Sequence, residues 1–281
     1  MAESSHSGLV SQFYDTHPIN EQQIIDKLTQ DGADLSQLSE DILQDYDQDH
    51  YGGPEANDVL ARLAGVDDNA YVLDVCSGLG GPARYLAHNY GCRVTGIDLT
   101  ESRVAGATRL TQMVGLDHRV KFHCANALDN KLPDGVFDVV ISQEAFCHIP
   151  DKPRVVGECV RVLKMGGRIA FTDILARNRI TAEMRDRLKR EMTHVELTTL
   201  ESYRQLLERE GCSILVADDI GEAWTEILVG RLAMYRSLKD QTVARFGEAH
   251  FKQWDSAYSF FVGLYQTGEL AGGRFLARRN R

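Results

Sequence analysis

The amino-acid sequence predicts an α/β fold built on a mostly parallel sheet with helices on both faces. Continuous apolar runs alternate with helical segments between Tyr71 and Leu175, as they do in parallel sheets that are buried on both sides. A glycine turn, Gly78-Leu79-Gly80-Gly81, separates the first run from a helix, so its backbone N–H groups can approach a bound ligand. The chain has 281 residues, enough for one large domain or for one domain with a smaller appendage.

Composition narrows the class of partners. The formal net charge of −10 disfavours nucleic acid, because phosphate binding requires a basic surface. No apolar run approaches the ~18 to 20 residues that cross a bilayer, and the N-terminus lacks the pattern of a secretory signal. We therefore expect a cytoplasmic protein without a membrane span. The 6 cysteines form no C-x-x-C pair and are interpreted as reduced, mostly buried thiols, so no metal site is expected.

The N-terminal region, residues 1–64, is predicted to be a helical lid over the glycine turn, with a helical edge of the core as the alternative. Residues 1–9 are small and polar and are expected to be disordered. Two or three short helices follow, and Asn20 is predicted to cap a helix over residues 21–31. Candidate acceptor contacts here, with core packing as the alternative, are Tyr14, His50 and Tyr51.

Strands and helices are then expected in alternation. Right-handed crossovers place the loops after parallel strands along one edge of the sheet, so polar residues that follow those strands converge there. The five strands are predicted at residues 71–75, 92–98, 118–124, 136–142 and 168–174. Helices are predicted after the glycine turn and at residues 101–115 and 151–164.

The last hundred residues are less regular. Helices are predicted at residues 177–192 and 200–210, a sixth strand at 213–217, and a final edge strand at 272–278. Between these two strands, helices are predicted at residues 224–246 and 251–265. Their aromatic residues at helical spacing favour packing in a core. Trp224 is nevertheless retained as a candidate acceptor contact.

Three polar positions indicate the kind of ligand that the glycine turn binds. Asp98 lies twenty positions beyond Gly78, a spacing at which a carboxylate can accept hydrogen bonds from the two hydroxyls of a ribose. Asn126 follows the third strand and can meet a purine edge. Asp74, with Ser77 beside the turn, would repel a pyrophosphate but suits a ligand that carries an α-amino group. These positions favour S-adenosylmethionine over a dinucleotide.

Five segments together carry a family resemblance: VLDVCSGLGGPARYLA, VTGIDLT, CANAL, FDVVISQEAFCHIPDK and ECVRVLKMGGRIAFTDIL. The set resembles the class I S-adenosylmethionine-dependent methyltransferases over about residues 71–175. Within that superfamily it is similar to the small-molecule branch, especially sarcosine/dimethylglycine N-methyltransferase-like proteins and sugar O-methyltransferases. The resemblance implies a Rossmann-like, seven-stranded sheet with an N-terminal helical lid and a C-terminal helical insertion. Met165 departs from the pattern, in which a proline usually precedes the two glycines.

The resemblance also implies roles for individual residues. Cofactor contacts are implied for Asp74, Ser77, Gly78 and Gly80 at the methionine part, Asp98 at the ribose, Leu99 beneath the adenine, Asn126 and Ala127 at the adenine edge, Gln143 at the methionyl end, and Arg103. His148 is implied as a general base that Asp173 orients; the alternatives are a structural histidine at a strand end and an aspartate that caps a helix or loop. Glu144 joins the candidate acceptor contacts, with a solvated acid as its alternative.

The predicted function is transfer of a methyl group from S-adenosylmethionine to an amine or hydroxyl of a small molecule. A non-catalytic protein that binds the same cofactor, a thiol or carbon acceptor, and a nicotinamide enzyme remain as alternatives. The predicted division is a lid at residues 1–64 and a cofactor-binding core at residues 65–281 with a helical insertion at about 222–266. Both a monomer and a homo-oligomer remain open.

Overall fold

The structure is a computed structural model that describes residues 2–17 and 19–280. Its centre is a seven-stranded sheet with the order β3-β2-β1-β4-β5-β7-β6, in which neighbouring strands among β1 to β5 pair in parallel and β7 is antiparallel to both β5 and β6. The predicted α/β fold with a mostly parallel sheet is confirmed. The strands are β1 (Tyr71–Val75), β2 (Arg93–Asp98), β3 (Val120–Cys124), β4 (Phe137–Gln143), β5 (Leu163–Ala176), β6 (Cys212–Asp219) and β7 (Leu270–Arg279).

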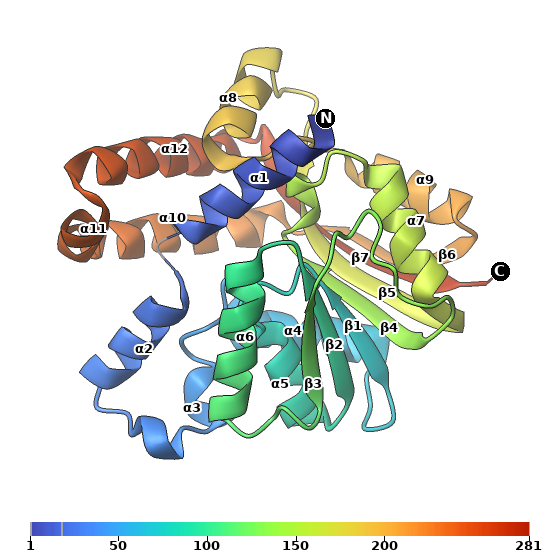
Figure 1. The fold of residues 1–281 in the computed structure, drawn as a ribbon. Coiled ribbons are helices and arrows are strands. Elements are labelled where there is room, and N and C mark those ends of the chain that lie inside the picture. The colour runs from blue at the N-terminus through green and yellow to red at the C-terminus, as the bar shows by residue number, and fades with distance from the viewer. Residues whose placement is uncertain (1, 18, 281) are drawn as a thin grey trace.

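Helices cover both faces of this sheet, as Figure 1 shows. The predicted cap of the second helix is confirmed, because the Asn20 side chain accepts a hydrogen bond from the backbone N–H of Gln23. The α-helices are α1 (Ala2–Asp15), α2 (Glu21–Gln30), α3 (Glu40–Leu43), α4 (Gly53–Ala64), α5 (Gly81–Tyr90), α6 (Glu101–Met113), α7 (Lys152–Val162), α8 (Ala182–Met192), α9 (Leu200–Arg209), α10 (Gly221–Ser237), α11 (Lys239–Phe246) and α12 (Glu248–Thr267). Two short 3₁₀ segments are η1 (Leu35–Gln37) and η2 (Phe146–His148).

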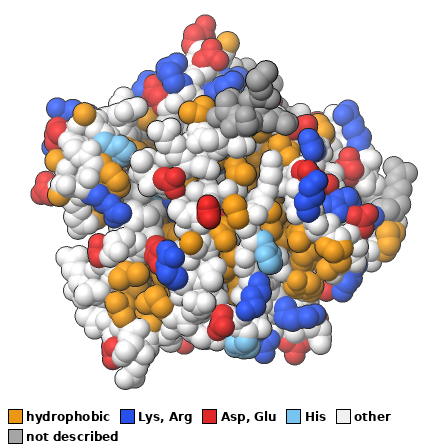
Figure 2. All heavy atoms as spheres, viewed as in Figure 1, with side chains coloured by type: hydrophobic (Ala, Val, Ile, Leu, Met, Phe, Trp, Pro, Cys, Tyr) orange, Lys and Arg blue, Asp and Glu red, His pale blue; other side chains and the backbone are white. Residues whose placement is uncertain are grey.

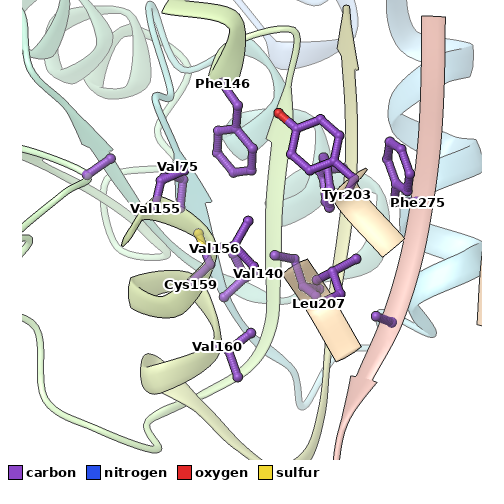
Figure 3. Packing of buried hydrophobic residues seen from close by; sticks show 14 of the residues in the cluster. Val75, Val140, Phe146, Val155, Val156, Cys159, Val160, Tyr203, Leu207 and Phe275 are labelled. Carbon is purple, nitrogen blue, oxygen red and sulfur yellow. The ribbon is translucent and has the colours of Figure 1, made fainter. Parts of the chain in front are cut away.

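The strand residues alternate between two hydrophobic cores, one on each face of the sheet. Leu73 and Val75 of β1 belong to the core that α7 and α9 cover, whereas Val72 belongs to the core under α4 and α5. Figure 3 shows the first core, where residues of α7 and the α9 residues Tyr203 and Leu207 lie against the sheet. Burial on both faces explains why the parallel strands are continuous apolar runs.

Two predictions about the fold were wrong. The last strand, β7, is not at an edge, because it lies between β5 and β6 and pairs with both. Its residues 270–273 and 275–277 are buried and carry no charge, which suits a central position and not an exposed edge. Residues 2–9 of the stretch predicted to be disordered are helical, because α1 begins at Ala2 and ends at Asp15. Residue 1 lies outside the described residues.

Helices α1, α8, α10 and α12 lie together beyond the carboxyl ends of the parallel strands (Figure 1). In Figure 1, α1 crosses the molecule between α6 and the pair α10 and α12, and α2 and α3 run down beside α6. A third core, rich in aromatic residues, joins α8, α10 and α12. The predicted segment 224–246 is divided into α10 and α11, which meet at Leu238.

The distribution of surface charges and the burial of the cysteines agree with what the composition predicted. Acidic and basic side chains are interspersed over the face in Figure 2, without a continuous basic stripe there. Across the described residues, no helix has both the length and the apolar character that a bilayer crossing requires. All 6 cysteines are free thiols; Cys124 is exposed, Cys76 is half-buried and the others are buried. Met165 is 62% exposed, so its departure from the family pattern lies at the surface.

Candidate functional site

A cavity lies where the parallel strands end, and it extends under α1, α10 and α12. Residues from the ends of β1, β2 and β4 line one part, and residues of α1, α10 and α12 line the other. Predicted site residues that line it are Asp74, Ser77, Gly78, Asp98, Leu99, Arg103, Asn126, Ala127, Gln143, Tyr14, His50, Tyr51, Glu144 and His148. Gly80, Asp173 and Trp224 are predicted site residues that do not line it.

The turn after β1 requires unusual backbone conformations. Cys76, Gly78 and Gly80 have φ angles of 61°, 53° and 80°, and the N–H of Gly80 donates to the carbonyl of Ser77. A Cβ at Gly80 would lie 2.4 Å from the Phe122 ring of β3. Gly80 therefore lets the turn pack against the sheet, and its contact with the cofactor stays a prediction.

Asp98 closes β2 and is oriented by backbone donors. Its Oδ2 accepts a hydrogen bond of 2.9 Å from Gly78 N, and its Oδ1 accepts one of 2.8 Å from Thr100 N. Each carboxylate oxygen keeps further lone-pair capacity toward the cavity. Burial raises the pKa of Asp98 even though these backbone donors oppose the shift. The geometry suits a carboxylate that accepts hydrogen bonds from a diol.

Buried polar atoms without a partner lie beside the glycine turn. They are Asp74 Oδ2, Ser77 Oγ and Gln143 Oε1, and all three side chains line the cavity. Burial, followed by repulsion from Asp98, raises the pKa of Asp74 to about 7. Buried polar groups without partners are rare in folded proteins, so these atoms indicate a ligand that supplies donors. The α-ammonium group of S-adenosylmethionine would supply such donors.

The residues expected near the adenine lie at the same end of the cavity. Leu99 and Ala127 line it, and the Oδ1 of Asn126 accepts a hydrogen bond of 2.9 Å from Leu128 N. This local bond orients the Asn126 amide. On the opposite side, Gln143 Nε2 lies 3.0 Å from His50 Nδ1, so the end of β4 contacts the loop before α4.

His148 and Tyr14 meet across the second part of the cavity, although they are 134 residues apart. His148 Nε2 lies 3.0 Å from the Tyr14 hydroxyl, and Nδ1 lies 3.2 Å from the carbonyl oxygen of Thr193. The Thr193 hydroxyl is closer to Nδ1, at 2.8 Å, and its own proton goes to the carbonyl of Met192. With both Thr193 oxygens as acceptors, we assign the proton to Nδ1, and Nε2 then accepts the hydrogen bond from Tyr14. Burial, followed by the nearby Cys147 and Asp49, raises the pKa of Tyr14 well above its usual value. Tyr14 is therefore a neutral donor to His148.

Asp173 makes no hydrogen bond to the His148 ring, so the predicted direct pair is not formed. Asp173 is fully buried on β5, where its Oδ1 accepts from Cys147 N at 3.0 Å and its Oδ2 accepts from the Tyr203 hydroxyl at 2.6 Å. Thr193 is the residue that contacts Nδ1, and it follows α8 in a left-handed conformation with φ 56°. Thr193 is remote from the family motifs in the sequence, so the pattern predicted the imidazole but not its partners.

Glu144 joins the loop before α4 to the sheet. Its carboxylate accepts hydrogen bonds of 2.7 Å from Tyr51 N and 2.6 Å from the Thr172 hydroxyl. Its φ of 49° is unusual for a residue with a side chain, so the surrounding contacts hold it in place. Burial raises the pKa of Glu144 to about 7. Trp224 packs edge-on against Tyr51 at 5.0 Å and supports that ring from outside the cavity.

Asp49 and Arg231 line the cavity and were missed by the sequence analysis. Arg231 on α10 donates to the carbonyl oxygens of Gln48, Asp49 and His50, and the Asp49 carboxylate lies 3.5 Å from Arg103. Burial would raise the pKa of Asp49, but His17, Arg103 and Arg231 together lower it below the usual value. Asp49 lies in the same loop as His50 and Tyr51, where neighbouring aspartates made it indistinguishable in the sequence. Arg231 had no sequence signal.

The cavity thus joins a set of acceptors at a glycine turn to a compartment lined by tyrosines, histidines and two arginines. With the strand order, this defines a class I S-adenosylmethionine-dependent methyltransferase fold. Residues 73–171 match a protein family described as a methyltransferase domain. This match and the strand order agree with a class I S-adenosylmethionine-dependent methyltransferase domain in this part of the chain.

Named relatives agree with this class. The chain is 45% identical over 114 residues to sarcosine/dimethylglycine N-methyltransferase of Halorhodospira halochloris, covering 41% of this chain and 40% of the relative. It is 29% identical over 229 residues to phosphoethanolamine N-methyltransferase of Triticum aestivum, covering 81% of this chain and 45% of the relative. The chain therefore spans less than half the length of these two relatives.

A solved structure shows the same fold. Phosphoethanolamine N-methyltransferase 2 of Haemonchus contortus, in complex with S-adenosyl-L-methionine, matches with a TM-score of 0.75 at 20% sequence identity. The match covers 96% of this chain and 60% of that chain. This likeness supports the architecture, and the roles of the site residues rest on the geometry described above.

Proposed function

We propose that the protein transfers the methyl group of S-adenosylmethionine to the nitrogen of a small amine that also carries an acidic group. The observation that carries this proposal is the cavity itself, which is lined both by the acceptors at the glycine turn and by the Tyr14–His148 pair. A methyl donor bound at the first set and an amine bound at the second would share one enclosed space. Such placement can supply several kcal/mol of the barrier to methyl transfer.

The two parts of the cavity have opposite charges, which suits these two ligands. Asp74 and Asp98 lie at the donor end and favour the positive charge of a sulfonium and an ammonium. Two guanidinium groups, those of Arg103 and Arg231, lie at the acceptor end against the low-pKa carboxylate of Asp49 and against Glu144, whose pKa burial raises to about 7. Histidines there carry little charge at neutral pH, since burial lowers the pKa of His17 and lowers that of His50 to about 4. The surplus positive charge supports an acceptor with an acidic group.

The names of the relatives support the same acceptor class. Sarcosine and dimethylglycine are amines with a carboxylate, and phosphoethanolamine is an amine with a phosphate. The aromatic residues Tyr235, Trp254 and Tyr258 line the acceptor end, and aromatic rings attract a methylated ammonium group. An amine that gains methyl groups can therefore remain bound at this end.

Proton transfer follows from the hydrogen bonds of Tyr14 and His148. S-adenosylmethionine supplies a methyl group on a sulfonium, a good leaving group, and the attacking nitrogen must present a lone pair. The Tyr14 oxygen can accept an N–H proton of the amine while its own proton moves to His148 Nε2, because Nε2 already accepts that hydrogen bond. Thr193 holds the proton on Nδ1, which keeps Nε2 free to accept. We assign Tyr14 and His148 to this relay and leave Asp173 outside it.

The proposed organisation retains a lid and a core. Residues 1–64 would cover the donor and acceptor ends through Tyr14, Asp49 and His50, and residues 65–281 would form the core. The helical insertion, at about 222–266, would contribute Arg231 and the aromatic rings of the acceptor end.

The test is a methyl-transfer assay with labelled cofactor against matched acceptors. Sarcosine, dimethylglycine and phosphoethanolamine should accept label, whereas ethanolamine and dimethylamine, which lack the acidic group, should react at least about tenfold more slowly by kcat/KM. Arg231→Gln should reduce this preference. Label transfer to hydroxyl or carbon acceptors but not to any amine would refute the proposal, and cofactor binding without transfer to any acceptor would favour a non-catalytic protein.

A further inference from the structure

Lys152 is a buried lysine just outside the cavity, and the reaction proposed above does not use it. It is the first residue of α7 and is 3% exposed. Its ammonium donates to three backbone carbonyl oxygens, those of Phe146 at 2.6 Å, Ile149 at 2.7 Å and Glu196 at 2.6 Å. An ammonium group has three N–H donors, so these bonds use all of them.

The three carbonyls belong to the two segments that hold the imidazole of His148. Phe146 and Ile149 flank His148 in the chain. Glu196 follows Thr193, which contacts His148 Nδ1. Val195 N also donates to the carbonyl of Cys147 at 3.0 Å, so the two segments are joined directly. Lys152 therefore connects the backbone of His148 with the segment that fixes its ring.

Asp173 holds the same turn from the opposite side. It accepts from Cys147 N, one residue before His148, and the Tyr203 hydroxyl holds its second oxygen. Burial lowers the pKa of Lys152, and the Asp173 charge opposes this shift. Burying two charges is costly unless hydrogen bonds satisfy them, and here each charge is bonded to the short segment around His148.

We propose that Lys152 is a positioning residue that, with Asp173, fixes the turn around His148 so that Nε2 stays within hydrogen-bond distance of Tyr14. This inference rests on the proposed function for its kinetic test but not for its spectroscopic one. A general base displaced by about 1 Å can lose roughly 100-fold in rate, so a rigid turn has a direct catalytic consequence.

The kinetic experiment compares Lys152→Met and Lys152→Gln with Arg154→Met, a charge removal at an exposed position on the same helix. We expect Lys152→Met to lower kcat by about 10- to 100-fold, with the Kd for S-adenosylhomocysteine within about twofold of wild type. Lys152→Gln, which keeps two donors, should lose less, and Arg154→Met should match wild type. In a His148→Ala background, Lys152→Met should cause no further loss of kcat. Multiplicative losses in the double variant would overturn the proposal.

The spectroscopic experiment needs no substrate. Imidazole ¹⁵N shifts of wild type and Arg154→Met should show His148 with its proton on Nδ1, and both Lys152 variants should show averaged shifts from mixed tautomers. Unchanged shifts in a folded Lys152 variant would refute the positioning role even if turnover fell. Absence of methyl transfer by the wild type would refute the proposed function and would leave this test intact. If Lys152→Met does not fold, Lys152→Gln decides both experiments.

Discussion

Asp74→Asn should weaken cofactor binding and stabilise the free protein at the same time. The substitution keeps the shape of the side chain but removes the charge of a carboxylate that is 3% exposed and has an unpartnered Oδ2. Since a hydrogen bond to a charged group contributes about 1.5 to 3 kcal/mol, the Kd for S-adenosylmethionine should rise by roughly 10- to 100-fold.

The pH dependence follows from the raised pKa of Asp74, about 7 in the free protein. Ionised Asp74 pairs with an ammonium, so cofactor affinity should fall as pH decreases below about 7. In the unfolded chain Asp74 ionises near its ordinary pKa of 3.8, so the folded protein loses stability as pH rises from about 4 to about 7, and the loss is complete above about 7. The order of magnitude of that cost is about 4 kcal/mol at pH 8. Asp74→Asn should remove a part of it.

Calorimetric titration gives the Kd, and thermal unfolding at pH 6 and pH 8 gives the stability of the free and bound protein. Asp129→Asn is the control, because Asp129 is exposed and pairs with Lys131 at the surface. The cofactor should raise the Tm of wild type more at pH 8 than at pH 6, and this difference should vanish in Asp74→Asn. Wild-type affinity in Asp74→Asn, or the same pH dependence in both proteins, would refute the assignment of Asp74 to the ammonium.

Three further predictions concern single residues. Asp98→Ala should raise the Kd for S-adenosylmethionine by about 10- to 100-fold in calorimetry while an analogue lacking both ribose hydroxyls loses little; equal losses for both ligands would contradict the ribose contact. Tyr14→Phe should lower kcat by about 100-fold with little change in cofactor Kd, and an unchanged kcat would remove the relay to His148. Gly80→Ala should destabilise the fold by about 1 to 3 kcal/mol more than Gly115→Ala in denaturant titrations, because a Cβ meets no atom within 4 Å at Gly115; equal losses would mean that backbone strain alone explains the glycine.

The sequence by itself determined the parallel strands β1 to β5 and the convergence of acidic residues at their carboxyl ends. These features depend on local patterns: apolar runs, glycines with positive φ, and acids that follow strands. Parallel strands connected by right-handed crossovers bring such acids to one edge, so Asp74 and Asp98 could be placed together before any coordinates were known. The family resemblance also predicted His148 as a site residue, and it lines the cavity.

Only the tertiary structure decided what surrounds these residues at the acceptor end. Tyr14, His148 and Thr193 meet from segments that are separated by up to 179 positions, a pairing without local signature. The same holds for β7, whose central place depends on pairing with β5 and β6, and for Arg231, whose donors reach the loop that contains Asp49. Periodicity and turn chemistry act between neighbours in the chain, whereas acceptor recognition depends on side chains that only packing brings together.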